Sequence, residues 1–389
     1  MSFRILMTAD TVGGVWVYAL ELARGLEKKG VEVIMALMGG HMSPSQKQEA
    51  AEIPGLRVFE SDYKLEWMET PWHDVEQAGD WLLELETCFR PDIIHLNGFA
   101  HGPLPWKAPV FMVGHSCVLS WWQAVKKTPL PGQWSIYESR VRNGLMSADM
   151  IAAPSQAMLD NLHGHYGPLP NGRVILNGRD PDCFFPGAKE QFIITAGRLW
   201  DEAKNIRVLA RAARNTDWPV CVAGETRHPD MGISSENAQT AHLSGDFTDL
   251  HQIGYVSQPL MAKWLSRASV YVSPALYEPF GLTVLEAALS GCALVLSDIP
   301  SLRELWEGAA LFANPESPEE FAAALNKMAD NAAYRQKMAA FARKRALEAY
   351  TPGRMADEYL ACYMELAGAR ETVFTKPCST GASRWTETA

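Results

Sequence analysis

Residues 277–287 read Tyr-Glu-Pro-Phe-Gly-Leu-Thr-Val-Leu-Glu-Ala. They follow a short apolar run over 270–273, pass a proline and a glycine, and then open a helix. The stretch therefore predicts a buried strand, a tight loop and a helix, which together form the repeating unit of a parallel α/β sheet. The first amide groups of such a helix have no helical partner and can bind an anion.

The same alternation of short apolar runs and helical patterns continues on both sides of this stretch. Strands are predicted at 3–7, 31–37, 92–96 and 110–113 in the first half, and at 192–196, 220–223, 270–273 and 293–296 in the second. Between the halves, residues 177–187 contain two prolines and two glycines, so they continue neither a helix nor a central strand. We expect two α/β domains, residues 1–180 and 188–350, with a ligand cleft at the carboxyl ends of their strands.

The end of the chain is helical and then changes composition. Helices are predicted at 319–328, at 332–350 and again after Pro352. Residues 371–389 are rich in Thr, Ser, Lys and Gly, which predicts a flexible tail.

Charge and cysteine content exclude several classes of protein. Lys and Arg number 35 and Asp and Glu number 45, a net charge of −10 that argues against nucleic acid as a partner. The seven cysteines show no zinc-binding spacing, and we expect a soluble, reduced, cytoplasmic protein without a disulfide framework. No apolar run is long enough for a signal peptide or an integral membrane segment.

Two cations and two glycines stand where predicted strands end. Arg198 ends the strand at 192–196 and Lys204 follows six positions later, so together they can clamp a diphosphate, although each alone is more often a solvated charge. Gly13 and Gly14 follow the first strand and allow a similar close approach. They do not form G-x-G-x-x-G, which disfavours NAD.

Two carboxylates and one histidine lie in the same neighbourhood. Glu278 and Glu286 flank the predicted anion site, where a carboxylate is suited to accept hydrogen bonds from ribose or hexose hydroxyls. The alternative is a surface turn with solvated glutamates. His115 ends the strand at 110–113 and faces the predicted cleft, and its alternative is an ordinary structural histidine.

Taken together, these residues resemble the retaining family-four glycosyltransferases of the GT-B fold, from Arg4 to about Gly368. The matching pieces, in family order, are Gly13-Gly14-Val15, His115, Asn177-Gly178, Gly197-Arg198-Leu199, Gly254-Tyr255-Val256, and Ser273-Pro274 before Glu278 and Glu286. The resemblance implies two Rossmann-like domains, with the nucleotide sugar held mainly by the second. It also implies that the last helix, about 353–370, crosses back onto the first domain.

The resemblance further implies roles for single residues. The implied catalytic residues are His115 near the reacting carbon of the donor sugar, Glu278 on the sugar ring, and Arg198 with Lys204 on the diphosphate. The implied donor-binding residues are Gly13, Gly14, Val256, Phe280, Gly281, Leu282, Thr283 and Glu286, the last on the ribose. The family often has its lysine five positions after the arginine, where this chain has Ala203.

Acceptor and metal sites are less marked in the sequence. Eight of the 13 tryptophans fall in the first 185 residues, and indole rings stack well on sugars. We expect the acceptor, which is a sugar, a lipid-linked molecule or a small molecule, near Trp16, His95, Asn97, Trp121 and Trp122. Asp180 and Asp182 form an Asp-x-Asp triplet, but they lie among turn residues, so no metal or other cofactor is expected.

The sequence thus predicts a metal-independent, retaining glycosyltransferase that uses a nucleotide sugar, with UDP chosen because it is the commonest donor nucleotide of the family. Weak peripheral association with a membrane is compatible with this prediction. Two alternatives are a phosphorylase or hydrolase on the same fold and a non-catalytic protein that binds nucleotide sugars.

Overall fold

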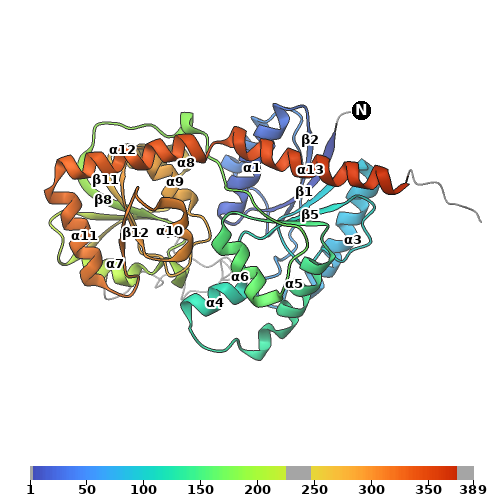
Figure 1. The fold of residues 1–389 in the computed structure, drawn as a ribbon, viewed down its shortest axis with the longest axis horizontal. Coiled ribbons are helices and arrows are strands. Elements are labelled where there is room, and N and C mark those ends of the chain that lie inside the picture. Colours follow the sequence, from blue (N-terminus) through green and yellow to red (C-terminus); the bar gives the residue numbers. More distant parts are fainter. Residues whose placement is uncertain (1–2, 225–246, 375–389) are drawn as a thin grey trace, which may run out of the picture.

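The computed structural model describes residues 3–224 and 247–374, which form two α/β domains (Figure 1). The first domain is built on a seven-stranded parallel sheet in the order β3-β2-β1-β4-β5-β6-β7. Its strands are β1 (Arg4–Asp10), β2 (Glu32–Met38), β3 (Arg57–Glu60), β4 (Ile93–Leu96), β5 (Val110–Val113), β6 (Met150–Ala153) and β7 (Gly172–Val174). Its helices are α1 (Gly14–Glu27), α2 (Pro44–Ala51), α3 (Trp72–Phe89), α4 (Val118–Val125), η1 (Gly132–Trp134), α5 (Ser135–Ser147) and α6 (Gln156–Tyr166).

The second domain repeats this plan with a six-stranded parallel sheet in the order β10-β9-β8-β11-β12-β13. Its strands are β8 (Glu190–Ala196), β9 (Val220–Ala223), β10 (Leu250–Gly254), β11 (Ala268–Ser273), β12 (Ala293–Ser297) and β13 (Leu311–Ala313). The remaining helices are η2 (Pro181–Cys183), η3 (Glu202–Lys204), α7 (Ile206–Ala213), α8 (Gln258–Arg267), α9 (Leu282–Leu289), α10 (Pro300–Trp306), α11 (Pro318–Asp330), α12 (Ala332–Ala349) and α13 (Pro352–Phe374).

Each sheet reverses its strand order once, and this point locates the ligand site. In the first sheet the chain proceeds from β1 to β2 and β3 on one side and then returns to place β4 on the other side of β1. In the second sheet β8 and β11 adjoin in the same way. Ligands of open α/β sheets bind at such reversal points, beyond the carboxyl ends of the strands.

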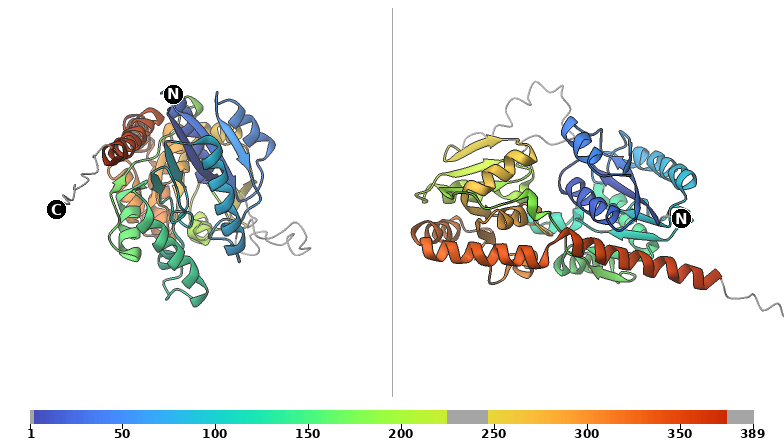
Figure 2. Two further views of the ribbon diagram at one scale, coloured as in Figure 1. Left: turned by 90° about the vertical axis from the view of Figure 1, so that its right-hand side faces the viewer. Right: turned by 90° about the horizontal axis from the view of Figure 1, so that it is seen from above.

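The last two helices join the domains. The views in Figure 2 show α12 and α13 following one another along one side of the molecule, α12 on the second domain and α13 on the first. Helix α13 buries Met355, Tyr359 and Tyr363 in the core of the first domain. Its contact with α1 is close, because a methyl group at Gly25 would lie 2.6 Å from the Cβ of Ala356.

Helix α13 continues to Phe374, so residues 371–374, which the composition assigned to the tail, are helical. They extend a helix that is already anchored on α1, and the tail prediction was wrong for them. The rest of the predicted tail, 375–389, lies outside the described residues. Within the described part of the chain, no helix is both long and apolar enough to cross a bilayer.

Candidate active site

The point of strand reversal in the first sheet lies opposite the point of strand reversal in the second sheet, where the two domains meet. Gly13, between β1 and α1, has a φ of +87°, a conformation that side chains disfavour, and a methyl group there would lie 3.6 Å from Nη1 of Arg198. A methyl group at Gly14 would lie 3.7 Å from Cδ1 of Leu282, the first residue of α9. The glycine turn of the first domain therefore meets the arginine and the α9 start of the second.

Arg198 is anchored but accessible. Its Nη2 donates to Oδ2 of Asp201 at 3.2 Å, and its guanidinium lies 5.3 Å from the ring centre of Trp200. Its side chain is still 41% exposed, so it can meet an anion beside the glycine turn.

Lys204 lies deeper, at the end of η3. Its Nζ donates to Oε2 of Glu278 at 2.6 Å, and both side chains are mostly buried. They line a small hollow at the carboxyl ends of β8 and β11, together with Gly197, Tyr271, Ser273 and Thr283. Ala203, in contrast, is packed in the core, so the lysine one place later is the residue that faces the hollow.

The loop before α9 is held from both domains. Oγ of Ser155, at the start of α6 in the first domain, donates to the carbonyl of Pro279 at 2.7 Å, and Oγ of Ser301 donates to the carbonyl of Glu278 at 2.6 Å. Gly281 has a φ of +86° and caps the helix. These contacts fix the backbone where the first amides of α9 can meet a ligand.

Among the predicted donor-binding residues of this loop, Phe280 turns its ring into the core against Tyr350, so only its backbone is available. Thr283 lines the hollow and accepts a hydrogen bond from the hydroxyl of Tyr271 at 2.8 Å. Val256 follows β10 at the edge of the sheet and is half-buried, but it is not among the residues that line the hollow.

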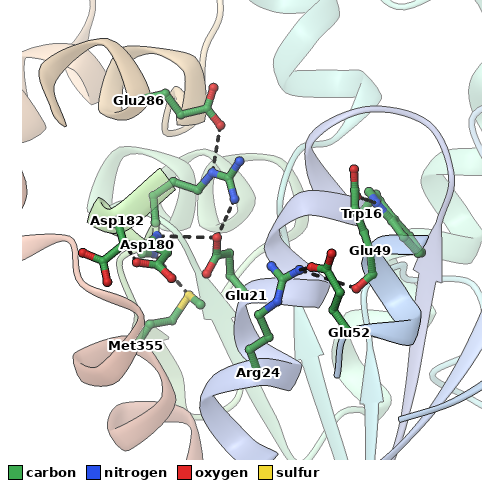
Figure 3. A network of polar contacts seen from close by, with 11 residues as sticks. Trp16, Glu21, Arg24, Glu49, Glu52, Asp180, Asp182, Glu286 and Met355 are labelled. Atoms are coloured by element: carbon green, nitrogen blue, oxygen red, sulfur yellow. Dashed lines mark hydrogen bonds and ion pairs between the residues drawn. The ribbon is translucent and has the colours of Figure 1, made fainter. Parts of the chain in front are cut away.

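Glu286 has a partner that sequence reasoning missed. Its Oε1 accepts a hydrogen bond from Nε of Arg179 at 2.8 Å, and Nη1 of the same arginine donates to Glu21 on α1 (Figure 3). Burial raises the pKa of the Glu286 carboxyl above its usual range, and Arg179 opposes that rise. Arg179 stands among the turn residues of the interdomain segment, which gave no signal for a buried charge.

His115 is held by Asn97. Nδ2 of Asn97 donates to the carbonyl of Thr8 at 2.6 Å, which fixes Oδ1 as the acceptor, and Nε2 of His115 lies 2.8 Å from that oxygen. His115 is therefore protonated on Nε2. Burial lowers its pKa to about 3, and the neighbouring His95 contributes less, so the imidazole is neutral at physiological pH.

The structure corrects two expected acceptor contacts. His95 is 0% exposed, and its Nε2 and Nδ1 bond Oδ1 of Asn97 and the hydroxyl of Tyr363 on α13. Trp16 is 3% exposed and donates from Nε1 to Glu49. Both side chains belong to the packing of the first domain, so neither reaches an acceptor in this structure.

The adjacent tryptophans of α4, Trp121 and Trp122, lie in two different environments. Nε1 of Trp121 donates to Oδ1 of Asp201 at 2.9 Å, so Asp201 joins this ring to Arg198. Trp122 instead lines a hollow of about 800 Å³ on the first domain and donates to Thr128. Of these two tryptophans, Trp121 is the one linked to Arg198, through Asp201. Asn97 is linked to the candidate site through its contact with His115.

Asp10 is a further site residue that sequence reasoning missed. It ends β1 directly before the glycine turn, and its Oδ1 accepts a hydrogen bond from the amide of Val12 at 2.8 Å. Burial raises its pKa to about 7, although this amide and Arg198 favour the charged form. Its position at the carboxyl end of the first strand could have indicated from the sequence that it belongs to the site.

The Asp-x-Asp triplet is explained by its turn. Oδ1 of Asp180 accepts from the amide of Asp182 at 2.9 Å and caps the short helix η2. Within residues 3–224 and 247–374, no three His, Cys, Asp or Glu side chains are grouped so that they could hold a metal ion.

Comparison with known proteins gives consistent matches over both domains. The family model described as Glycosyltransferase Family 4 matches residues 12–182, and the model described as Glycosyl transferases group 1 matches residues 190–331. Glycogen synthase of Mycobacterium tuberculosis is 26% identical to this chain and aligns with 88% of it and 90% of its own length.

Two solved structures resemble the whole described fold. Sucrose-phosphate synthase from Thermosynechococcus elongatus has a TM-score of 0.76 at 17% identity and covers 94% of this chain and 100% of its own. The Anabaena protein HepE, solved in complex with UDP and glucose, has a TM-score of 0.71 at 15% identity, with the same coverage of both chains.

Proposed function

The chain belongs to the family-four, group 1 glycosyltransferases and has their GT-B fold, and on that premise we propose that it is a metal-independent, retaining glycosyltransferase. In this proposal it moves a hexosyl group from a UDP-sugar to an acceptor hydroxyl. The observation that carries the proposal is the position of Arg198, which follows the end of β8 and lies against Gly13 in the turn between β1 and α1. A diphosphate between the two domains would contact both.

The proposed reaction breaks the bond between the anomeric carbon and the diphosphate oxygen. The negative charge that develops on this oxygen is stabilised by Arg198, Lys204 and the first amides of α9. The acceptor hydroxyl attacks from the same face of the sugar, and its proton passes to the departing phosphate oxygen. His115, neutral and fixed through Asn97, orients the sugar, and Glu278 accepts hydrogen bonds from sugar hydroxyls.

The choice of UDP rests on family frequency and on the Anabaena structure, which holds UDP and glucose on a similar fold. A phosphorylase or hydrolase would release sugar 1-phosphate or free sugar, so product analysis with and without phosphate separates these alternatives. We place the reaction in the cytoplasm, because the cysteine spacing is that of a reduced protein.

The experiment that tests the donor class is a thermal-shift panel of UDP, GDP, ADP and their sugar conjugates. A ligand that binds only the folded chain raises its melting temperature by mass action. We expect UDP and UDP-sugars to give the largest increases. If no nucleoside diphosphate or nucleotide sugar stabilises the protein, the proposed function is wrong.

The two glutamates of the α9 motif are expected to have separable effects. Glu286→Gln should weaken binding of free UDP by about tenfold or more, because it removes a charged acceptor from the ribose. Glu278→Gln should leave UDP binding close to wild type and lower turnover, because its proposed ligand contact is with the sugar and the glutamine oxygen can still accept from Nζ of Lys204. Calorimetry with UDP and steady-state kinetics measure both effects. Equal losses of UDP affinity in the two variants would contradict the assignment.

Asp10 predicts a pH dependence of donor binding. Since its pKa is about 7, the carboxyl gains its negative charge as the pH rises through neutrality, and that charge repels a diphosphate beside Arg198. The KM for the donor should therefore rise between pH 6 and pH 8. Asp10→Asn should flatten this rise, and an unchanged profile in the variant would exclude Asp10 as its source.

Metal independence is the remaining expectation about cofactors. Arg198 and Lys204 supply positive charge at the diphosphate, so activity should survive an excess of EDTA. The measurement is the initial rate before and after EDTA, with manganese or magnesium added back. Complete loss with EDTA and recovery with a divalent ion would contradict metal independence and would make Asp180 and Asp182 candidate metal ligands.

A further inference from the structure

One arginine of the interdomain segment bonds a carboxylate from each domain. Arg179 is only 2% exposed, and it donates from Nη1 to Glu21, on α1, and from Nε to Glu286, on α9. The Glu21 side chain is 1% exposed and the Glu286 side chain 10% exposed. Figure 3 shows the two carboxylates approaching the guanidinium from different elements.

The guanidinium is held in place by its surroundings. Its central carbon lies 5.0 Å from the ring centre of Phe184, and its own backbone amide donates to the carbonyl of Tyr350 at 3.1 Å. Backbone and side chain are thus both anchored. Arg179 therefore presents Nε and Nη1 to the two carboxylates in one fixed arrangement.

Stability alone does not account for this arrangement. Two buried carboxylates share one buried cation, and Nη2 of Arg179 is buried without a hydrogen-bond partner in the described structure. Replacing buried ion pairs by apolar groups of similar volume is often neutral or stabilising, because burial of each charge is costly. The contact with Glu286 points instead to a role in ligand binding.

We propose that Arg179 is a positioning residue for the nucleotide: it holds Oε1 of Glu286 so that this carboxylate meets the ribose hydroxyls in a fixed orientation, which Glu21 of the first domain supports. The inference rests on the proposed function, in which Glu286 binds the ribose. It adds that ribose recognition depends on a residue of the interdomain segment that does not touch the ligand.

The test compares calorimetric dissociation constants for UDP and for 2′,3′-dideoxy-UDP, which lacks both ribose hydroxyls. The ratio of the two constants isolates the hydroxyl contribution from general changes in affinity. Arg179→Met removes the positioning contact, and the double variant Glu21→Gln with Arg179→Met also avoids leaving Glu21 as an unpaired buried charge. Arg354→Met is the matched control, because Arg354 bonds the carbonyl of Leu176 near the same segment and is paired with Glu358.

We expect wild type and Arg354→Met to bind UDP at least about tenfold more tightly than the dideoxy analogue, in line with hydrogen bonds to a charged group. In both Arg179 variants most of that preference should be lost, while melting curves remain cooperative. If neither variant folds, Arg179→Lys replaces them, and its preference should fall between these limits because one ammonium cannot reproduce the fork of donors.

The other outcomes are distinguishable. A full preference in the Arg179 variants would overturn the inference and leave the ribose role of Glu286 intact. An equal loss in Arg354→Met would show general loosening of the segment and would also overturn it. No preference in wild type would contradict the ribose role itself, and the inference with it.

Discussion

His115→Ala is expected to lower kcat by about 10²-fold or more while changing the affinity for UDP little. The imidazole is neutral, is fixed through Asn97, and lies beside the end of β5. In the proposed reaction a neutral ring in this position orients the donor sugar and carries no proton, because the departing phosphate is the proposed base. His115→Asn and His115→Gln should recover part of the loss, since they keep a hydrogen-bonding group.

A purely structural histidine predicts a different result: a lower melting temperature with near-normal kcat in the protein that folds. Both quantities are therefore measured on one preparation. His95→Gln is the matched control, because His95 bonds the same Asn97 oxygen but is fully buried against α13. A His115→Ala protein that is destabilised and fully active would refute the catalytic role.

Arg198→Ala should lower kcat/KM by about 2–4 kcal/mol in transition-state free energy, with a higher donor KM and a lower kcat. The reason is that, in the proposed reaction, its charge acts on the diphosphate oxygen that becomes negative during bond breaking. Lys204→Ala should change the same parameters in the same direction, although it also leaves Glu278 without its cation.

The control for Arg198 is Arg267→Ala. Arg267 also stacks on a tryptophan, Trp264, and pairs with a carboxylate, Glu190, but it is the last residue of α8, directly before β11 begins, away from the strand ends of the site. Its removal should leave kcat/KM unchanged. Wild-type kinetics in Arg198→Ala would remove this arginine from the site.

The strand ends that form the site could be predicted from two features of the sequence. These are the apolar run of each strand and the glycine or charged residue that follows it. The runs at 110–113 and 220–223 coincide with β5 and β9, and each of these two strands is a continuous apolar stretch. Short edge strands such as β7 and β13 have too few residues to show a pattern. In a parallel sheet, residues that follow central strands gather at one edge, which is why Gly13 and Arg198 could be named from the sequence.

The remaining features depend on contacts between distant segments. His95 is buried because Tyr363 of α13 packs against it and bonds its ring. Trp16 is buried in the core cluster of the first domain that also contains Tyr363. No local pattern around either residue reports that packing. Arg179 lies among prolines and glycines that indicate only a break, yet its bonds to Glu21 and Glu286 make that break part of the site.

In the proposed reaction the protein transfers a hexosyl group from a nucleotide sugar with retention and without metal. Proton NMR of the anomeric signal tests it directly, using the donor that gives the largest thermal shift, a mixture of sugar and sugar-phosphate acceptors, and EDTA. We predict that donor loss equals release of nucleoside diphosphate and that the new glycoside keeps the anomeric configuration of the donor. An inverted product, phosphate-dependent formation of sugar 1-phosphate, or no turnover until a divalent ion is added would contradict the account.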